Sequence, residues 1–199
     1  MDKPKIILLN GCSSAGKTSL VKAIQYLSEE PFLSSGIDTT FAALPAKYFS
    51  NDPGGGGKAS QGVKFISEVD PTGFPILKVK TGPYAKKFYT SITKIIKQLA
   101  SDGHNLVIDE VIWERERLEE YSSTLKDYSL YFVKVDCNLA NMEEREILRG
   151  NRSRGMARWQ FTKIKDLDWN YDYRVDTTNT SSFINAQNIL RFLKNKDKK

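Results

Sequence analysis

The sequence predicts an α/β protein, a three-layer α/β/α sandwich built on a parallel sheet. Along its 199 residues, short apolar runs alternate with segments of amphipathic helical spacing. This order is typical of a parallel sheet covered by helices on both faces. A glycine-bounded loop of small residues joins the first apolar run to the first helix. Hydrophobic residues make up 40% and charged residues 27% of the chain, so we expect one globular domain over residues 1–199.

The expected strands are apolar runs bounded by turns. They cover residues 5–10, the pair Phe32-Leu33, residues 106–108 running into Asp109-Glu110, residues 129–137, and "YRVDTT" at 173–178. The expected helices cover residues 17–28, 86–101, 113–125 and 138–149, with a terminal helix capped by Ser181 or Ser182. Apolar side chains at helical spacing mark the buried faces: Phe88, Ile92, Ile95, Ile96 and Leu99; Leu118, Tyr121 and Leu125; Ile184, Ile189, Leu190 and Leu193.

Residues 51–82 interrupt this pattern. They include "NDPGGGGKASQG" and "DPTGFPILK", in which proline and glycine break any long element. We expect an irregular insertion with at most a small hairpin. A connection of this length is either functional or mobile. At the other end of the chain, the basic tail 194–199 is expected to be a frayed, solvated end.

Composition excludes several classes of protein. The two cysteines, Cys12 and Cys137, form no disulfide framework or metal cluster, and we expect both to be small, reduced and partly buried. The single histidine, His104, lies in the turn "DGHN" and has no partner for a zinc site or a serine-type triad. No apolar run is long enough to cross a bilayer, and no secretory signal precedes residue 6. A cytoplasmic location is therefore expected.

The loop "GCSSAGKT" matches the full pattern G-x-x-x-x-G-K-[ST]. It follows an expected strand and opens an expected helix, which is the context that the pattern requires. Small residues let successive backbone N–H groups point at a phosphate, and the helix N-terminus favours an anion. Lys17 is expected to reach the outer phosphates, and Thr18 to offer its hydroxyl to Mg²⁺. The expected nucleotide-binding residues are Gly11, Cys12, Ser13, Ser14, Ala15, Gly16, Lys17, Thr18 and Ser19.

The segment "LVIDE" supplies an acidic residue at the end of a buried strand. Such a residue beside the phosphate strand can hold the water shell of the metal, and this is the role expected for Asp109 in preference to Glu110, with Thr18 as the second metal-site residue. The alternative is a carboxylate that caps the next helix.

Five arginines lie in "REILRGNRSRGMAR", at positions 145, 149, 152, 154 and 158. One interpretation is a solvated face paired with Glu143, Glu144 and Glu146. Binding to nucleic acid would require more interleaved aromatic residues, although the net charge of +6 is compatible with it. The third interpretation, which we favour beside a phosphate loop, is an arginine lid over residues 145–160 that clamps a transferring phosphoryl group.

The segments "GCSSAGKTSL", "GIDTTFAALP", "LVIDEV", "REILRGNRSRGMARWQ" and "YDYRVDTT" occur in an order that resembles the chloramphenicol phosphotransferase-like family. This is a family of phosphate-loop kinases similar to adenylate, shikimate and gluconate kinases. The resemblance covers nearly the whole chain. It implies a P-loop nucleoside triphosphate hydrolase/kinase fold. The chain departs from the family pattern at Ile164-Lys165, where the family often has a histidine. Its 51–82 insertion is also longer than the family pattern predicts.

The resemblance also implies roles for single residues. The aspartate of the family's G-[VI]-D motif, here Asp38, would be the general base for the acceptor hydroxyl. The arginines of its R-G-[DN]-R motif, here Arg149 and Arg152, would contact phosphates. The sequence alone leaves Asp38 open between such a base and a helix cap before "TTFAALP".

We therefore expect an ATP- and Mg²⁺-dependent phosphotransferase that moves the γ-phosphate to a hydroxyl of a small molecule. Asp38, Lys17, Arg149 and Arg152 are the expected catalytic residues. Tyr84, Phe88, Trp113 and the insertion are placed near the acceptor. Two alternatives remain: a kinase that acts on a protein or RNA acceptor, and a nucleotide-binding regulatory protein. No membrane contact is expected, nucleic acid is the less favoured partner, and the oligomeric state is not predicted.

Overall fold

A computed structural model describes residues 3–50, 57–149 and 154–196. Its large sheet contains β1 (Lys5–Asn10), β2 (Phe32–Gly36), β6 (Asn105–Glu110), β7 (Ser129–Asp136) and β8 (Tyr173–Asp176). The spatial order is β2-β6-β1-β7-β8, and all neighbours are parallel. The predicted parallel sheet is confirmed, and the carboxyl ends of its strands meet at one edge.

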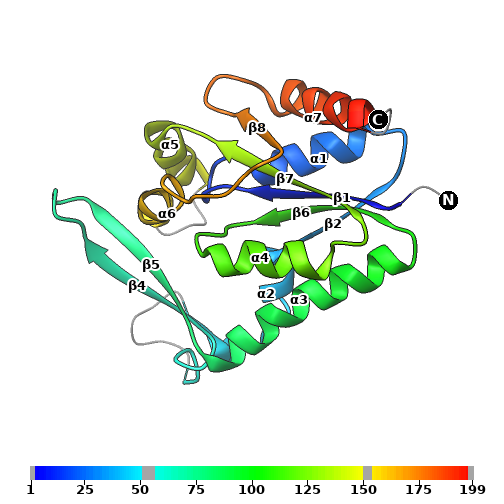
Figure 1. Cartoon of the computed structure of the whole chain (residues 1–199). Helices are drawn as coiled ribbons and strands as arrows, with labels where there is room; N and C mark the ends of the chain where they lie inside the picture. The colour runs from blue at the N-terminus through cyan, green and yellow to red at the C-terminus, as the bar shows by residue number, and fades with distance from the viewer. Residues whose placement is uncertain (1–2, 51–56, 150–153, 197–199) are drawn as a thin grey trace.

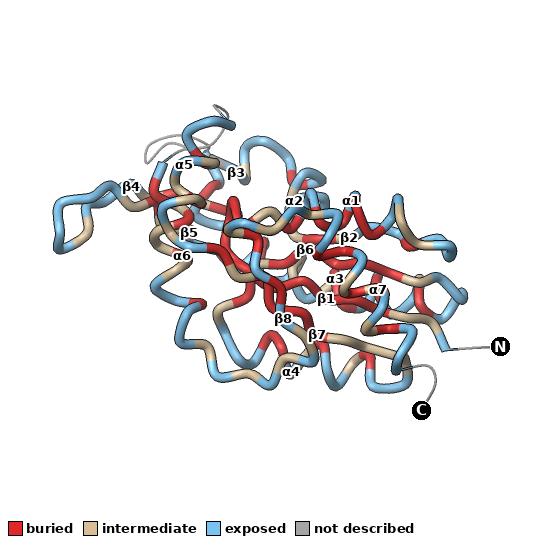
Figure 2. The backbone as a smooth tube through the Cα atoms, turned by 90° about the horizontal axis from the view of Figure 1, so that it is seen from above, coloured by how far each residue is buried: buried red, intermediate tan, exposed pale blue. Residues whose placement is uncertain are grey.

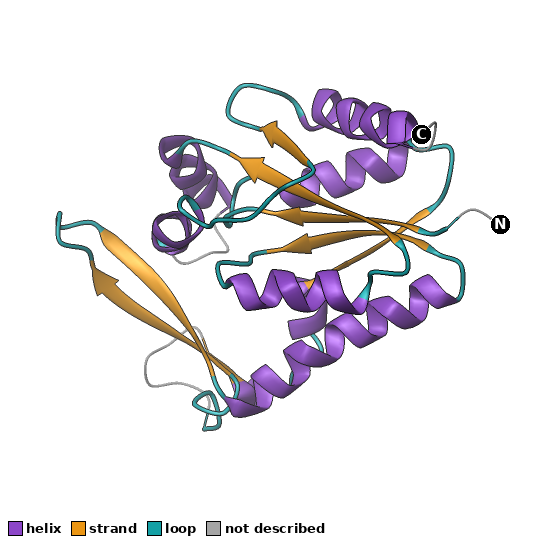
Figure 3. Ribbon diagram, in the orientation of Figure 1, coloured by secondary structure: helices purple, strands orange, loops and turns teal. Residues whose placement is uncertain are grey.

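Helices cover both faces of this sheet (Figures 1 and 3). One face carries α1 (Lys17–Leu27) and α7 (Ser182–Lys196), and the other carries α3 (Pro83–Ser101) and α4 (Arg115–Thr124). The alternation of side chains along β1 shows why: Ile7 and Leu9 belong to the core under α1 and α7, whereas Ile6 and Leu8 belong to the core under α3 and α4. The three-layer sandwich predicted from the sequence is therefore the observed architecture.

Two further helices lie beyond the carboxyl edge of the sheet. These are α5 (Leu139–Arg149) and α6 (Met156–Ile164), which pack against one another at the same end of the molecule as the strand tips (Figure 1). Asn138 caps α5 as expected, because its Oδ1 accepts a hydrogen bond of 2.8 Å from Asn141 N. The helix α6 was not predicted. Short elements α2 (Ile37–Phe41) and η1 (Ala46–Tyr48) complete the helices of the described residues.

The small hairpin allowed for in the predicted insertion is present, and residues 57–82 are more regular than expected. The insertion contains β4 (Val63–Val69) and β5 (Pro75–Thr81), an antiparallel pair to which the short β3 (Phe49–Ser50) adds. We call the hairpin β4–β5 the arm. It extends away from the main sheet, and its tip is exposed while buried segments concentrate in the strands of the large sheet (Figure 2). Asp70 closes its turn by accepting hydrogen bonds from the backbone N–H groups of Thr72 and Phe74, with Gly73 at φ 89°.

Some predicted boundaries and faces were wrong. The helix expected from residue 113 begins at Arg115. Ile95 and Ile184, expected to be buried, are each 51% exposed. The predicted frayed tail from 194 is helical as far as Lys196. Of the two caps predicted for the terminal helix, Ser181 is confirmed, since its Oγ accepts a hydrogen bond of 3.3 Å from Ile184 N.

Candidate functional site

The phosphate loop, residues 11–18, connects β1 to α1 at the carboxyl edge of the sheet. Its glycines are required by geometry. A Cβ on Gly11 would lie 2.5 Å from Val135 O, and Gly16 has φ 86°. Ser14 also adopts a positive φ of 61°. This backbone turns the loop around a hollow in front of α1, as a phosphate-binding loop requires.

Lys17, Thr18 and Asp109 meet inside this loop. The Lys17 ammonium is buried, 2.9 Å from Cys12 O and 3.5 Å from Asp109 Oδ1. Thr18 Oγ1 donates a hydrogen bond of 2.8 Å to Asp109 Oδ2. The next helix, α4, has Glu114 rather than Asp109 at its N-cap. The alternative in which Asp109 caps that helix is therefore wrong.

Asp38 lies at the same edge because Gly36 lets β2 approach β6. A Cβ on Gly36 would lie 2.4 Å from Asp109 O. The N-cap of α2 is Gly36 itself, and Asp38 lies in the first turn of the helix. The capping alternative for Asp38 is therefore also wrong, and the side chain is exposed beside the loop.

These residues share one cavity of about 510 Å³. Its charged lining residues are Lys17, Asp38, Asp109 and Arg149, and the phosphate loop contributes Ser13, Ser14, Gly16 and Thr18. The remaining wall is mostly apolar and comes from α2 and the residues after it as far as β3, from the arm, and from positions 111, 113 and 156: Ile37, Phe41, Ala42, Leu44, Ala46, Phe49, Val63, Phe65, Leu77, Val79, Val111, Trp113 and Met156. The structure thus joins an ionic end to an apolar end in one enclosure.

The predicted arginines have different environments. Arg149 lines the cavity. Arg145 instead donates to Thr177 O at 2.6 Å. Arg158 pairs with Glu143 at 2.6 Å and stacks on Phe74 of the arm. Arg152 lies outside the described residues.

Other predicted residues can also be located. Trp113 lines the cavity, whereas Tyr84 and Phe88 are not among its lining residues; Tyr84 packs on Tyr48, and Phe88 packs on the small core beneath the arm. Cys12 and Cys137 are buried free thiols. Burial raises the pKa of the Cys12 thiol to about 11. His104 is an exposed residue beside its turn, as expected.

Gln160 was missed by the sequence analysis. It lies on α6, is 4% exposed, and its Oε1 accepts a hydrogen bond of 2.5 Å from Ser13 N in the phosphate loop. Glu146, also missed, is 1% exposed and accepts hydrogen bonds from Gly155 N at 2.8 Å and Ala157 N at 2.9 Å. The sequence signal for both is weak: Gln160 ends the arginine-rich segment "REILRGNRSRGMARWQ", and Glu146 is expected there only as a partner on a solvated face.

The residues of the loop fit a nucleotide phosphate with Mg²⁺. Ser14 Oγ is buried without a hydrogen-bond partner, as expected of a polar atom that a ligand would satisfy. Magnesium in kinases is held by one or two carboxylates together with phosphates rather than by an all-protein cage. Thr18 and Asp109 match that donor set, and no group of three potential metal-binding His, Cys, Asp or Glu residues occurs in the described ranges.

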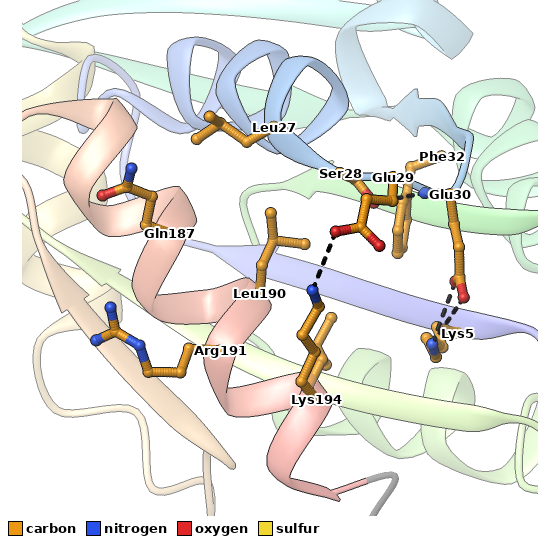
Figure 4. A pocket seen from close by; sticks show the side chains of 11 residues that line it. Lys5, Leu27, Ser28, Glu29, Glu30, Phe32, Gln187, Leu190, Arg191 and Lys194 are labelled. Carbon is orange, nitrogen blue, oxygen red and sulfur yellow. Dashed lines mark hydrogen bonds and ion pairs between the residues drawn. The ribbon is translucent and has the colours of Figure 1, made fainter.

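A second cavity, of about 490 Å³, lies at the opposite end of the large sheet, between the ends of α1 and α7 (Figure 4). Four of its five charged residues form ion pairs: Lys194 Nζ lies 3.3 Å from Glu29 Oε1, and Lys5 Nζ lies 3.2 Å from Glu30 Oε2. It is remote from the phosphate loop, so the candidate site is the cavity at the carboxyl edge. No helix of the described residues combines the length and apolarity needed to cross a membrane.

Comparison with solved structures shows the fold. The Mycobacterium tuberculosis APS kinase CysC, in complex with AMPPNP and APS, superposes with a TM-score of 0.64 at 14% identity, covering 98% of this chain and 99% of that one. Shikimate kinase from Acinetobacter baumannii gives 0.58 at 14% identity, over 100% and 97% of the two chains. A gluconokinase from Sinorhizobium meliloti gives 0.58 at 17%, over 98% and 94%. The fold is that of the P-loop kinases.

Comparison of sequences identifies the family as well as the fold. A protein of Mycobacterium tuberculosis strain H37Rv named "Putative O-phosphotransferase" is 32% identical over 180 residues, which are 90% of this chain and 78% of that protein. The model of the family described as chloramphenicol phosphotransferase-like protein matches residues 4–194. The chain therefore belongs to the chloramphenicol phosphotransferase-like family of P-loop phosphotransferases.

Proposed function

We propose that this phosphotransferase moves the γ-phosphate of ATP, with Mg²⁺, to a hydroxyl of an uncharged, largely apolar small molecule. The observation that carries the proposal is the division of the cavity into two ends. Lys17 and Asp109 meet in the phosphate loop with Asp38 beside them, and Arg149 lines the same cavity, whereas the described residues of the far wall bring apolar side chains. An anionic acceptor would find no charged partner among those residues of the far wall.

The enclosure also favours a small acceptor over a macromolecule. At about 510 Å³, the cavity has the size of sites that surround drug-sized molecules, roughly 300–1,000 Å³. The arm and the start of α6 are joined beside the cavity, since Leu77 N donates to Gly155 O at 3.1 Å, and both contribute lining residues.

In the proposed reaction the acceptor oxygen bonds to the γ-phosphorus while the bond to the β-phosphate oxygen breaks and ADP leaves. Asp38 accepts the hydroxyl proton, which it reaches from the first turn of α2. Lys17 and Arg149 hold the charge that spreads over the transferring group. Mg²⁺, held through Thr18 and Asp109, would neutralise phosphate charge. The role predicted for Arg152 stays a prediction.

The test is transfer of label from γ-labelled ATP to a panel of hydroxylated compounds, half of them neutral and apolar and half anionic. We expect labelled product from members of the neutral half only, and none after Mg²⁺ is chelated. Asp38→Asn should reduce the transfer rate by about 100-fold or more, because it removes a general base.

Asp127→Asn is the matched control. Asp127 is an exposed aspartate two residues before the start of β7, at the edge of the sheet opposite to the phosphate loop. Label that appears only as inorganic phosphate with every compound would overturn the proposal. So would transfer confined to the anionic half.

A further inference from the structure

Gln160 lies where α6 meets the phosphate loop, and it lines the cavity. Its Oε1 accepts a hydrogen bond from Ser13 N. A backbone N–H can only donate, so this contact determines which end of the carboxamide carries the oxygen. The two N–H groups of Nε2 must then point away from Ser13.

The structure records no hydrogen bond for Gln160 Nε2 within the described part of the chain, although the residue is 4% exposed. Gln160 Nε2 is not among the described side-chain atoms that are both buried and unpartnered, so this nitrogen is accessible from the cavity that the residue lines. Because the side chain lines the cavity, a molecule bound there can accept the hydrogen bonds of Nε2.

The position along the loop identifies the group that is bound. Lys17 Nζ, which reaches the outer phosphates in loops of this pattern, is 2.9 Å from Cys12 O. Cys12 directly precedes Ser13, the residue that holds Gln160. The orphaned hydroxyl of Ser14 follows directly in the chain. The Gln160 amide therefore lies at the outer-phosphate end of the loop.

We propose that Gln160 is a further catalytic residue, whose Nε2 donates a hydrogen bond to the γ-phosphoryl group of bound ATP while Ser13 N–H holds its Oε1. This inference rests on the proposed function, in which ATP is the phosphate donor. A hydrogen bond to an anionic oxygen is stronger than a neutral one. Gln160 gives such a bond without adding a charge beside Lys17 and Arg149.

The helix that carries Gln160 is held from three sides, so the donor is positioned before the ligand arrives. Glu146 accepts the backbone N–H groups of Gly155 and Ala157 at the start of α6. The ring of Trp159 packs edge-on against Trp113 at 5.1 Å. Arg158 joins α6 to α5 and to the arm. Preorganised donors of this kind need no reorganisation when charge develops.

The experiment compares two nucleotides that differ in the γ-group, Mg²⁺·AMPPNP and Mg²⁺·ADP, by calorimetric titration of the full chain. Gln160→Met keeps the length and removes both N–H donors. We expect its Kd for AMPPNP to rise about tenfold or more, the range for a hydrogen bond to a charged group, while the Kd for ADP changes less than about twofold.

Gln160→Glu is the second variant, since it keeps an oxygen for Ser13 N–H and protects the fold if Gln160→Met is unstable. It lacks the donors and adds a negative charge, so the loss specific to AMPPNP should be at least as large. Thr162→Ala, an exposed position on the same helix, should leave both Kd values unchanged.

The ratio of the two affinities separates the possible outcomes. If Gln160→Glu binds AMPPNP and ADP with the wild-type ratio, Gln160 does not touch the γ-group and the inference is wrong. Equal weakening of both nucleotides would show a structural role instead and would also overturn it. Failure of the wild-type chain to bind either nucleotide would refute the proposed function itself, and the inference with it.

Discussion

Gly36 lies directly beside Asp109 in the paired strands β2 and β6, so close that a Cβ on Gly36 would be 2.4 Å from Asp109 O and 3.2 Å from Asp109 Cβ. The contact brings two carboxylates to one edge of the sheet: Asp109 on β6, and Asp38 in the first turn of α2, two residues after Gly36. The backbone of Gly36 is extended. The glycine is therefore required for space rather than for an unusual dihedral angle.

Gly36→Ala is expected to separate the ends of β2 and β6 and to displace Asp38 relative to Asp109. Overpacking of this kind costs about 1–3 kcal/mol of unfolding free energy, measurable by urea denaturation. The rate of phosphoryl transfer should fall by more than the stability loss explains, because the fully folded variant keeps the altered geometry. The control is Gly57→Ala, where a Cβ meets no atom within 4 Å. Wild-type activity in Gly36→Ala would contradict the argument.

Glu146→Ala is expected to loosen the start of α6. The substitution leaves Gly155 N and Ala157 N without their acceptors, and an unsatisfied buried donor costs about 1–3 kcal/mol. Hydrogen exchange at these two amides should accelerate, with lower transfer activity. Glu144→Ala, at an exposed position on the same helix, should change neither. Unaltered protection of both amides in Glu146→Ala would show that another group holds α6.

Glu110→Gln is expected to change how stability depends on pH. Glu110 is fully buried, and this desolvation raises the pKa of its carboxyl above the ordinary 4.5, partly opposed by hydrogen bonds from Tyr121 and Tyr89 and by Arg117. A raised folded-state pKa means that the folded chain holds the proton more tightly than the unfolded chain. The contribution of Glu110 to stability is therefore complete at acid pH and is lost as pH rises through the raised pKa.

The unfolding free energy of the wild type minus that of Glu110→Gln should accordingly decrease from about pH 4 upward. Urea denaturation of both proteins across this range measures it. Glu119→Gln, on the exposed side of α4, controls for general effects of charge. A difference that increases with pH would mean that Glu110 is stabilised in its charged form.

Cys12 is expected to be unreactive in the folded protein. Burial raises the pKa of its thiol to about 11, with Lys17 opposing the shift. At pH 8 only about one thiol in a thousand would be ionised, and the thiolate is the reactive species. Ellman's reagent should modify Cys12 only upon unfolding, with Cys137→Ala used to assign the signal. Cys12→Ala should retain activity, because the loop requires a small residue there. Rapid modification at pH 8 would refute this.

The layers of the fold and the loop could be read from the sequence because their signals are local. A buried strand such as β1 can be recognised from a continuous run of apolar residues. The phosphate loop can be recognised from eight consecutive residues, 11–18. The predictions were wrong where contacts between distant residues determine which side chains are buried and which segments become regular. Ile95 and Ile184 fit the helical period but lie just beyond the covered stripe of their helices. The arm depends on the Asp70 turn, whose hydrogen bonds organise a segment that composition alone marked as irregular.

The residues of the candidate site also fall into those that the sequence predicts and those that it does not. Lys17, Thr18 and Asp109 come together because the carboxyl ends of neighbouring parallel strands share an edge. The helix α6 and Gln160 could not be found from the sequence, since the start of that helix is held by Glu146 from α5 and by the arm. No pattern within "MARWQFTKI" records those contacts.

The arm has a consequence for how such a protein diversifies. Its two ends meet, as Gly82 N donates to Gly62 O at 2.6 Å. Residues 63–81 therefore form a cassette that leaves and re-enters the body at one point, while supplying Val63, Phe65, Leu77 and Val79 to the cavity. Under the proposed function, substitution of these cavity-facing side chains would change which compounds are accepted, while the Leu77–Gly155 contact that helps to hold α6 is kept.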